Sequence, residues 1–289
     1  MFAYTIPEAM SIIESKEHPL DVDEEATEHQ EGPQGRPRTV LPSQEVMPLR
    51  KTLVERPEQG TAIDGGYIAP HYYDCFNYSL LGDNAGAVNV AVGVTSASPQ
   101  EGKTLVACNL AISLTVAYQK RTIIVDLNLR EPNIHRIFGI PAGPGLLEAM
   151  GDTTVQVAST SVKGLHLLTA GSSAGRMMTD HEFKRKRNGF RLSAAETSLQ
   201  LAQIAAFRNV LYSLKEYFDF VIVDLPSLHD HELPLLFTNQ LDGVLFVVQG
   251  GKTKQMDIDR SLQMLNEHRV IGFVYNRIET NGARNGRRQ

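Results

Sequence analysis

The sequence predicts an α/β fold in which helices cover both faces of a parallel sheet. From residue 70 onward, short apolar segments alternate with longer segments of helical periodicity. Nearly continuous apolar strands separated by helices are typical of parallel sheets buried on both faces. The expected strands span 88–95, 121–126, 165–169, 220–224, 243–248 and 270–275. The expected helices span 72–81, 102–118, 196–217 and 254–268.

Composition narrows the class of protein. The chain has 289 residues and is 42% hydrophobic, so it can bury a full core. Its net charge of −5 gives no indication of nucleic-acid binding. Two cysteines, Cys75 and Cys108, are too few for a disulfide framework or a four-cysteine zinc site, and Cys108 is expected in the core. Apolar runs are too short for a transmembrane helix, and the first ten residues lack the pattern of a secretory signal.

Charge and proline divide the chain into three parts. The first 65 residues hold 13 acidic and 6 basic residues, so residues 1–68 are expected to form a disordered arm. Within this arm, residues 4–13 are expected to be either a frayed end or a short docking helix. Residues 69–278 are expected to form the folded domain, and 279–289 a flexible basic tail. A basic insertion at about 173–195 contains Lys184–Arg187, which is either a solvated loop or a contact for anionic lipid or an acidic partner.

A phosphate-binding loop joins the first expected strand to the helix at 102–118. Such a loop needs inward backbone N–H groups, a lysine for the β/γ-phosphates and a hydroxyl for Mg²⁺. Gly102, Lys103 and Thr104 supply the end of this pattern, although Ala97 replaces its opening glycine. The residues expected to bind the nucleotide here are Ser98, Pro99, Gln100, Glu101, Gly102, Lys103, Thr104 and Leu105.

Two further strands each end in a carboxylate. Asp126 follows Ile123–Val125, and Asp224 follows Phe220–Val223. The carboxyl ends of parallel strands share the ligand-binding edge of a sheet, so both are expected beside the phosphate loop. With the Thr104 hydroxyl they predict a Mg²⁺ site for phosphoryl transfer. The alternative, a strand-end aspartate that caps the next turn, explains one such residue better than two.

The order of these motifs resembles the bacterial tyrosine kinases of capsule and exopolysaccharide synthesis, within the wider MinD/ParA-like ATPases. Asp126-x-Asn128-x-Arg130-x-Pro132-x-x-His135 is the most specific block, and the resemblance covers about residues 72–277. It implies a P-loop fold that uses ATP and Mg²⁺, with catalytic Lys103, Asp126, Asp224 and Arg130, and with Asn276 and Arg277 near the adenine. The resemblance also implies a cytoplasmic protein that is held at the inner face of the membrane by a partner, a membrane-spanning chain-length regulator. It further implies that the protein can form a homo-oligomer.

The sequence departs from that family at several positions. Asn128 replaces the second aspartate of the family's Asp-x-Asp motif, and an amide is neither a base nor a charge for Mg²⁺. Leu225-Pro226-Ser227 replaces the usual Thr-Pro-Pro, and Leu233 stands where a later aspartate is expected. No tyrosine follows Tyr275, so the C-terminal acceptor cluster is missing. The oligomerisation helix aligns with Asp74, Asn77 and Leu80, and the remaining candidate acceptors are Tyr72, Tyr73 and Tyr78.

Three functions remain open from the sequence. The first is an ATP-dependent tyrosine kinase or slow ATPase of polysaccharide export. The second is a catalytically degenerate, nucleotide-gated adapter of the same system. The third is a MinD/ParA-like positioning ATPase, although those proteins carry a second lysine where this chain has Ser98.

Overall fold

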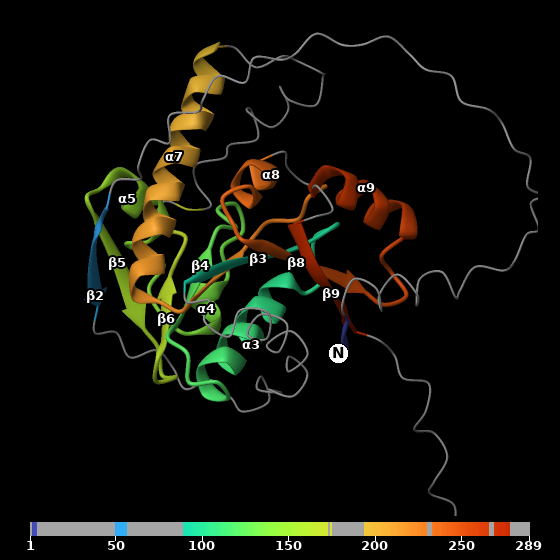
Figure 1. Ribbon diagram of the computed structural model, residues 1–289, viewed down its shortest axis with the longest axis horizontal. Helices are drawn as coiled ribbons and strands as arrows, with labels where there is room; N and C mark the ends of the chain where they lie inside the picture. The colour runs from blue at the N-terminus through green and yellow to red at the C-terminus, as the bar shows by residue number, and fades with distance from the viewer. Residues whose placement is uncertain are drawn as a thin grey trace, which may run out of the picture.

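The computed structural model forms one sheet with helices on both faces (Figure 1). It describes residues 2–4, 50–56, 89–172, 174, 194–229, 233–265 and 269–277. Across the sheet the strand order is β1-β9-β8-β3-β7-β4-β6-β5-β2. The strands are β1 (Phe2–Tyr4), β2 (Thr52–Arg56), β3 (Val90–Ser96), β4 (Thr122–Asp126), β5 (Thr154–Ser159), β6 (Leu165–Leu168), β7 (Phe220–Asp224), β8 (Gly243–Gln249) and β9 (Val270–Asn276).

The six central strands run parallel, as the apolar runs predict. β3 lies between β7 and β8, and β4 lies between β7 and β6. The chain therefore crosses over β7 when it passes from β3 to β4. Such a crossover leaves a ligand crevice at the carboxyl ends of the strands. The edge strands run the other way, because β5 is antiparallel to β6, β2 is parallel to β5, and β1 is antiparallel to β9.

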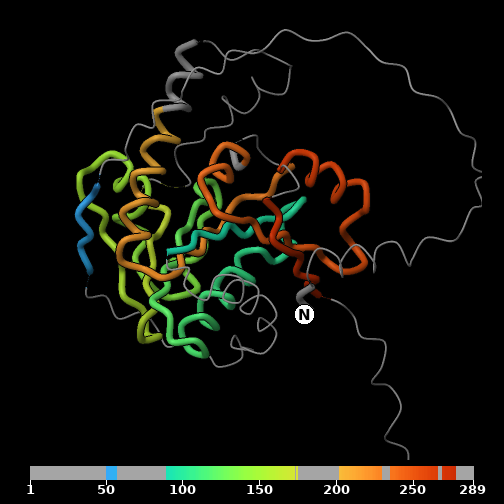
Figure 2. The backbone as a smooth tube through the Cα atoms, in the orientation of Figure 1, coloured from blue at the N-terminus to red at the C-terminus, as the bar shows by residue number. Residues whose placement is uncertain are grey.

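Helices form two layers, one on each face of the sheet. α3 (Lys103–Val116) and α4 (Ile134–Ile137) cover one face, where their apolar residues pack on Val92, Val94 and Ile124. α5 (Leu146–Gly151), α7 (Ala194–Tyr217), α8 (Leu233–Thr238) and α9 (Gln255–Leu265) cover the other face. Figure 2 traces this arrangement, with α3 on the opposite side of the strands from α7, α8 and α9. Cys108 is buried within α3, as predicted.

The expected α/β class is confirmed, and the six expected strands agree with the structure to within two residues. α3, α7 and α9 correspond to three of the expected helices, whereas β5 and the short helices α4, α5 and α8 were not expected. The helix at 72–81, the insertion from residue 175 to 193, the C-terminal tail and Cys75 lie outside the described residues. The proposed domain boundaries stay a prediction.

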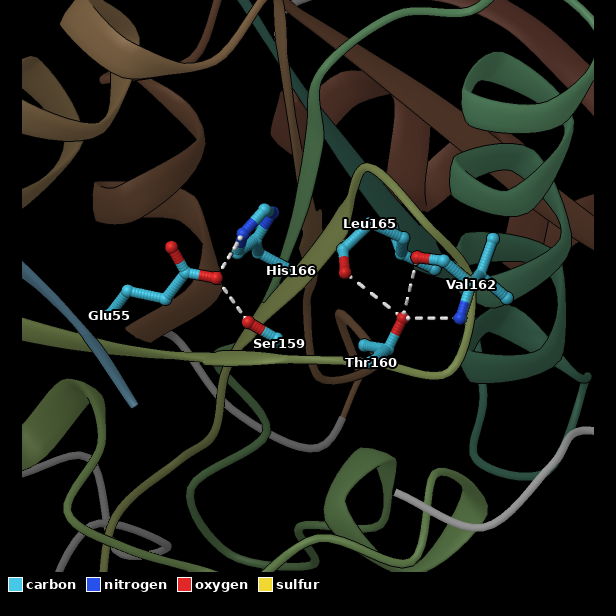
Figure 3. A network of polar contacts seen from close by, with 6 residues as sticks. All are labelled: Glu55, Ser159, Thr160, Val162, Leu165 and His166. Carbon is cyan, nitrogen blue, oxygen red and sulfur yellow. Dashed lines mark hydrogen bonds and ion pairs between the residues drawn. The ribbon is translucent and has the colours of Figure 1, made fainter. Parts of the chain in front are cut away.

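Two pieces of the expected disordered arm belong to the sheet. The prediction is therefore wrong for residues 2–4 and 52–56, which form the edge strands β1 and β2. The Glu55 carboxylate points toward Ser159 on β5 and His166 on β6 (Figure 3), accepting a hydrogen bond from the Ser159 hydroxyl and lying 3.2 Å from His166 Nε2. Lys51 Nζ donates to the Ala149 carbonyl at 2.8 Å. Tertiary contacts thus order a segment whose composition is typical of disorder.

A short turn joins β5 to β6 beside this cluster. The Thr160 hydroxyl donates to the carbonyls of Val162 and Leu165 and accepts from the Val162 N–H (Figure 3). These contacts stabilise the turn between β5 and β6. Among the described residues, none of the helices combines the length and the apolar character that a bilayer crossing requires.

Candidate nucleotide site

The phosphate loop lies at the carboxyl end of the central strand β3. Ser96 ends the strand, and its hydroxyl donates to the Ser98 carbonyl at 2.8 Å. Gln100 and Gly102 both adopt positive φ, 64° and 96°, and this turns the chain back toward the sheet before α3 begins at Lys103. Pro99 and Gln100 are exposed at the tip of the loop.

The first turn of α3 follows this loop directly. Its N-cap residue, Gly102, offers no side chain to cap the helix, so the first backbone N–H groups remain available to a ligand. Together with the helix dipole, such N–H groups form a favourable site for a phosphate. Lys103 is almost buried at 7% exposure, while Thr104 and Leu105 are half-buried.

Two carboxylates lie beside that helix terminus. The Thr104 hydroxyl donates to Asp224 Oδ2 at 2.7 Å, and Asp224 is directly opposite Asp126 in the pairing of β7 with β4. Both aspartates are buried, at 1% and 0% exposure. Asp224 Oδ1 is buried and has no hydrogen-bond partner among the described residues. The predicted neighbours Thr104, Asp126 and Asp224 are therefore brought together.

Asp126 also holds the following loop in place. Its Oδ1 accepts the Asn128 N–H at 3.1 Å, and its Oδ2 accepts the N–H groups of Asn133 and Ile134, both at 3.2 Å. Ile134 is the first residue of α4, so Asp126 satisfies donors that the helix leaves free. Three of about four acceptor positions on this carboxylate are thus occupied. This is the strand-end role considered as the alternative, and it coexists with the position beside Asp224.

Burial dominates the electrostatics of the pair. It raises the pKa of Asp126 well above its ordinary value, and the neighbouring charge of Asp224 raises it further. Burial also raises the pKa of Asp224, while the Thr104 hydrogen bond and the Lys103 charge oppose that rise. Two buried carboxylates this close favour either a shared proton or a bound cation. Oxygen ligands of this kind, together with an unpartnered Asp224 Oδ1, fit Mg²⁺.

The remaining predicted residues lie on the same edge of the sheet. Asn276 ends β9, and its side-chain Nδ2 donates to the Glu101 carbonyl at 2.9 Å. Arg277 follows, exposed, and its N–H donates to Asn276 Oδ1 at 3.0 Å. Arg130 is exposed on the loop between β4 and α4. Asn128 is half-buried on that loop, and its Oδ1 accepts the Glu131 N–H at 3.3 Å.

Two residues, one at the end of β8 and one in the turn that follows it, were not predicted. The Thr253 hydroxyl donates to Glu101 Oε1, and Gln249, which is paired with Asn276, has a buried Oε1 without a partner among the described residues. No sequence motif marks either residue. The strand-end rule that found Asp126 and Asp224 would have indicated Gln249, because it is the last residue of β8.

Comparison with known sequences finds relatives that match this chain over about two thirds of its length or more. The chain is 27% identical over 200 residues to the succinoglycan biosynthesis transport protein ExoP of Rhizobium meliloti, covering 68% of this chain and 23% of the relative. It is 24% identical over 219 residues to the tyrosine-protein kinase CpsD of Streptococcus pneumoniae serotype 4, covering 73% of this chain and 85% of the relative. This chain is related to the bacterial tyrosine kinases. No family model matches it.

Solved structures with similar folds include a chimeric protein and a kinase domain. The chimeric protein CapA2B2 superposes with a TM-score of 0.58 at 22% identity, covering 77% of this chain and 94% of that structure. The kinase domain of VpsO gives a TM-score of 0.57 at 24% identity, covering 73% and 94%. At such identities the likeness concerns the fold. The chain spans about a quarter of ExoP and of the Acinetobacter johnsonii kinase ptk, and most of CpsD.

Proposed function

We propose that this protein binds ATP with Mg²⁺ and acts as a tyrosine-protein kinase in capsule or exopolysaccharide biosynthesis and export. The observation that carries the proposal is the contact between the Thr104 hydroxyl and Asp224, next to Asp126 and at the uncapped start of α3. A hydroxyl and carboxylates at a phosphate-binding helix terminus are the parts that a Mg²⁺-dependent phosphoryl transfer uses.

Each residue has a defined task in this proposal. The N–H groups of residues 102–105 and the Lys103 ammonium bind the phosphates, and Ser98, Pro99, Gln100 and Glu101 form the loop around them. Thr104, Asp126 and Asp224 hold Mg²⁺, which offsets the charge that develops on the phosphates. Arg130 and Arg277 are exposed cations on the same edge, where they meet the transferred phosphate and the adenosine side respectively.

The same proposal extends to a partner and a place in the cell. One relative is named as a succinoglycan biosynthesis transport protein and another as a tyrosine-protein kinase. By analogy with them, we place this protein in the cytoplasm at the inner face of the membrane, together with a membrane-spanning chain-length regulator. Self-association into a homo-oligomer belongs to the same proposal; the residues of the expected oligomerisation helix lie outside the described part of the chain.

Lys103→Met tests nucleotide binding directly. The change removes the buried ammonium, and charge-assisted hydrogen bonds are roughly twice as strong as neutral ones, so affinity for ATP·Mg²⁺ should fall at least ten-fold in calorimetry. Lys163→Met, on the exposed β5–β6 turn, is the matched control and should bind like the wild type. Equal affinity of the two variants would contradict the phosphate-loop assignment.

A second candidate is the nucleotide-gated adapter. The observation in its favour is that Asp126 already accepts three backbone N–H groups, while the residue two positions later is Asn128. Asp126 therefore has little acceptor capacity left for the proton of an incoming tyrosine hydroxyl. A positioning ATPase is less well supported, because Ser98 replaces the second lysine of such proteins.

Asn128→Asp separates the kinase from the adapter. A positioned general base contributes about 10²–10⁴-fold, so restoring the carboxylate should raise phosphotransfer by a large factor within that range. The assay is incorporation of labelled phosphate with Mg²⁺ and the cytoplasmic segment of the membrane partner, followed by mapping of Tyr72, Tyr73 and Tyr78. Asn128→Ala is the control for loss of the amide. Absence of phosphotyrosine in both the wild type and Asn128→Asp would leave the adapter as the function.

A further inference from the structure

A continuous set of hydrogen bonds joins the phosphate loop to the turn between β8 and α9. Glu101, only 2% exposed, accepts the Ser98 N–H on Oε2 at 3.0 Å and the Thr253 hydroxyl on Oε1. The Thr253 hydroxyl in turn accepts the Gln249 N–H at 2.9 Å. The loop residue and the end of β8 are therefore connected through two side chains that are 152 positions apart in sequence.

Asn276 supports the same part of the loop from β9. Its Nδ2 donates to the Glu101 carbonyl, and a Cβ on Gly102 would lie 2.0 Å from that nitrogen. The carbonyl of Asn276 accepts the Gly250 N–H at 2.9 Å. Both the side chain and the carbonyl of Glu101 are thus held by neighbouring strand ends, immediately before the helix that carries Lys103.

The hydrogen bonds to Glu101 serve to fix the conformation of the loop rather than to contact a ligand. The Glu101 carboxylate is buried, and both of its oxygens accept hydrogen bonds from within the protein. A buried carboxylate that loses a hydrogen-bond donor is destabilised, because hydrogen bonds to charged groups are stronger than those between neutral groups. Loss of the Thr253 hydroxyl would consequently release Glu101, and with it Ser98.

We propose that Thr253 and Glu101 are a positioning pair, which holds the phosphate loop in the shape that binds the β- and γ-phosphates. Thr253 acts through Glu101 and touches no nucleotide itself. The inference rests on the proposed function, because the benefit of a fixed loop is expressed when phosphates bind. A preformed set of N–H donors gains affinity because the loop does not have to be ordered on binding.

The test compares Thr253→Val, which removes the hydroxyl, with Thr253→Ser, which keeps it. Thr238→Val is the matched control, since that buried hydroxyl donates to the Leu235 carbonyl within α8. The affinity for ATP·Mg²⁺ should fall about ten-fold in Thr253→Val and be restored in Thr253→Ser. In a Glu101→Met background, which lacks the acceptor oxygens, the additional effect of Thr253→Val should shrink below about two-fold, because the pair acts as one unit.

A second measurement needs no nucleotide. Amide hydrogen exchange of the segment 96–102 should accelerate in nucleotide-free Thr253→Val, and it should stay at the wild-type rate in Thr253→Ser and Thr238→Val. Thr253→Ala gives the same comparison if the valine variant fails to fold.

The outcomes separate this inference from the function on which it rests. Wild-type exchange and wild-type ATP affinity in Thr253→Val would overturn the positioning pair and leave the nucleotide site intact. Faster exchange with unchanged affinity would also overturn it, because the pair would then be structural alone. A wild-type chain that binds no ATP would overturn the proposed function, and the positioning role with it.

Discussion

Gly102→Ala should be unusually costly for a single methyl group. Gly102 has φ of 96°, and in this region a residue with a side chain costs about 1–2 kcal/mol. The added Cβ would also lie 2.0 Å from Asn276 Nδ2, so the amide must move and break its bond to the Glu101 carbonyl. Leaving that carbonyl without a partner adds about 1–3 kcal/mol, so the free energy of unfolding should fall by about 2–5 kcal/mol.

Gly251→Ala is the matched control for this substitution. Gly251 also has a positive φ, 72°, but a Cβ there would have no atom within 4 Å. Its cost should therefore be the backbone strain alone, about 1–2 kcal/mol. Urea unfolding of both variants measures the difference. In an Asn276→Ala background the steric part disappears, so Gly102→Ala should then cost no more than Gly251→Ala. Equal losses for the two glycine variants in the native background would refute the reasoning.

Two further predictions concern acidity and the edge strand. Burial raises the pKa of Asp126 to about 8, so the folded state keeps a proton that the unfolded chain releases near pH 4. The free energy of unfolding of the metal-free protein should therefore fall as the pH rises from about 4 to about 8. Asp126→Asn should flatten that dependence in urea unfolding, and parallel curves would contradict the assignment. Deleting residues 1–60 removes β2, so it should lower the Tm clearly more than deleting 1–49. Equal Tm values for the two truncations would show that β2 contributes no stability.

The sequence predicted the centre of the sheet better than its edges. β3, β7 and β8 are nearly continuous apolar runs. A strand buried on both faces needs apolar residues at almost every position, so this pattern can be recognised in the sequence. β2 has the sequence Thr-Leu-Val-Glu-Arg in an acidic, proline-containing segment, so its composition indicates disorder. It is ordered by contacts with β5, Ser159 and His166, about one hundred positions later, which local periodicity does not contain.

The same distinction applies to the site. Lys103, Thr104, Asp126 and Asp224 were predictable because each follows a strand or begins a helix in a known motif. Their proximity is seen in the Thr104–Asp224 contact and in the β4–β7 register. The support from Thr253 was not predictable, because a threonine in a turn has no distinguishing pattern and its partner is far along the chain. Motifs therefore indicated the residues that we propose face the ligand, whereas the contacts behind them required the structure.

The position of β3 has a consequence for the order in which the protein can assemble. Val90 pairs with Phe220 on one side, and Val92 pairs with Gly243 on the other. During synthesis, the strand that carries the phosphate loop therefore has no sheet neighbour until more than half of the chain has emerged. Strand pairings so distant in sequence slow folding, because the entropy of closing the long intervening loop is lost before the contacts that stabilise the pair can form. We expect nascent chains that end before residue 220 to expose the apolar faces of β3 and α3, and to depend on a chaperone until β7 arrives.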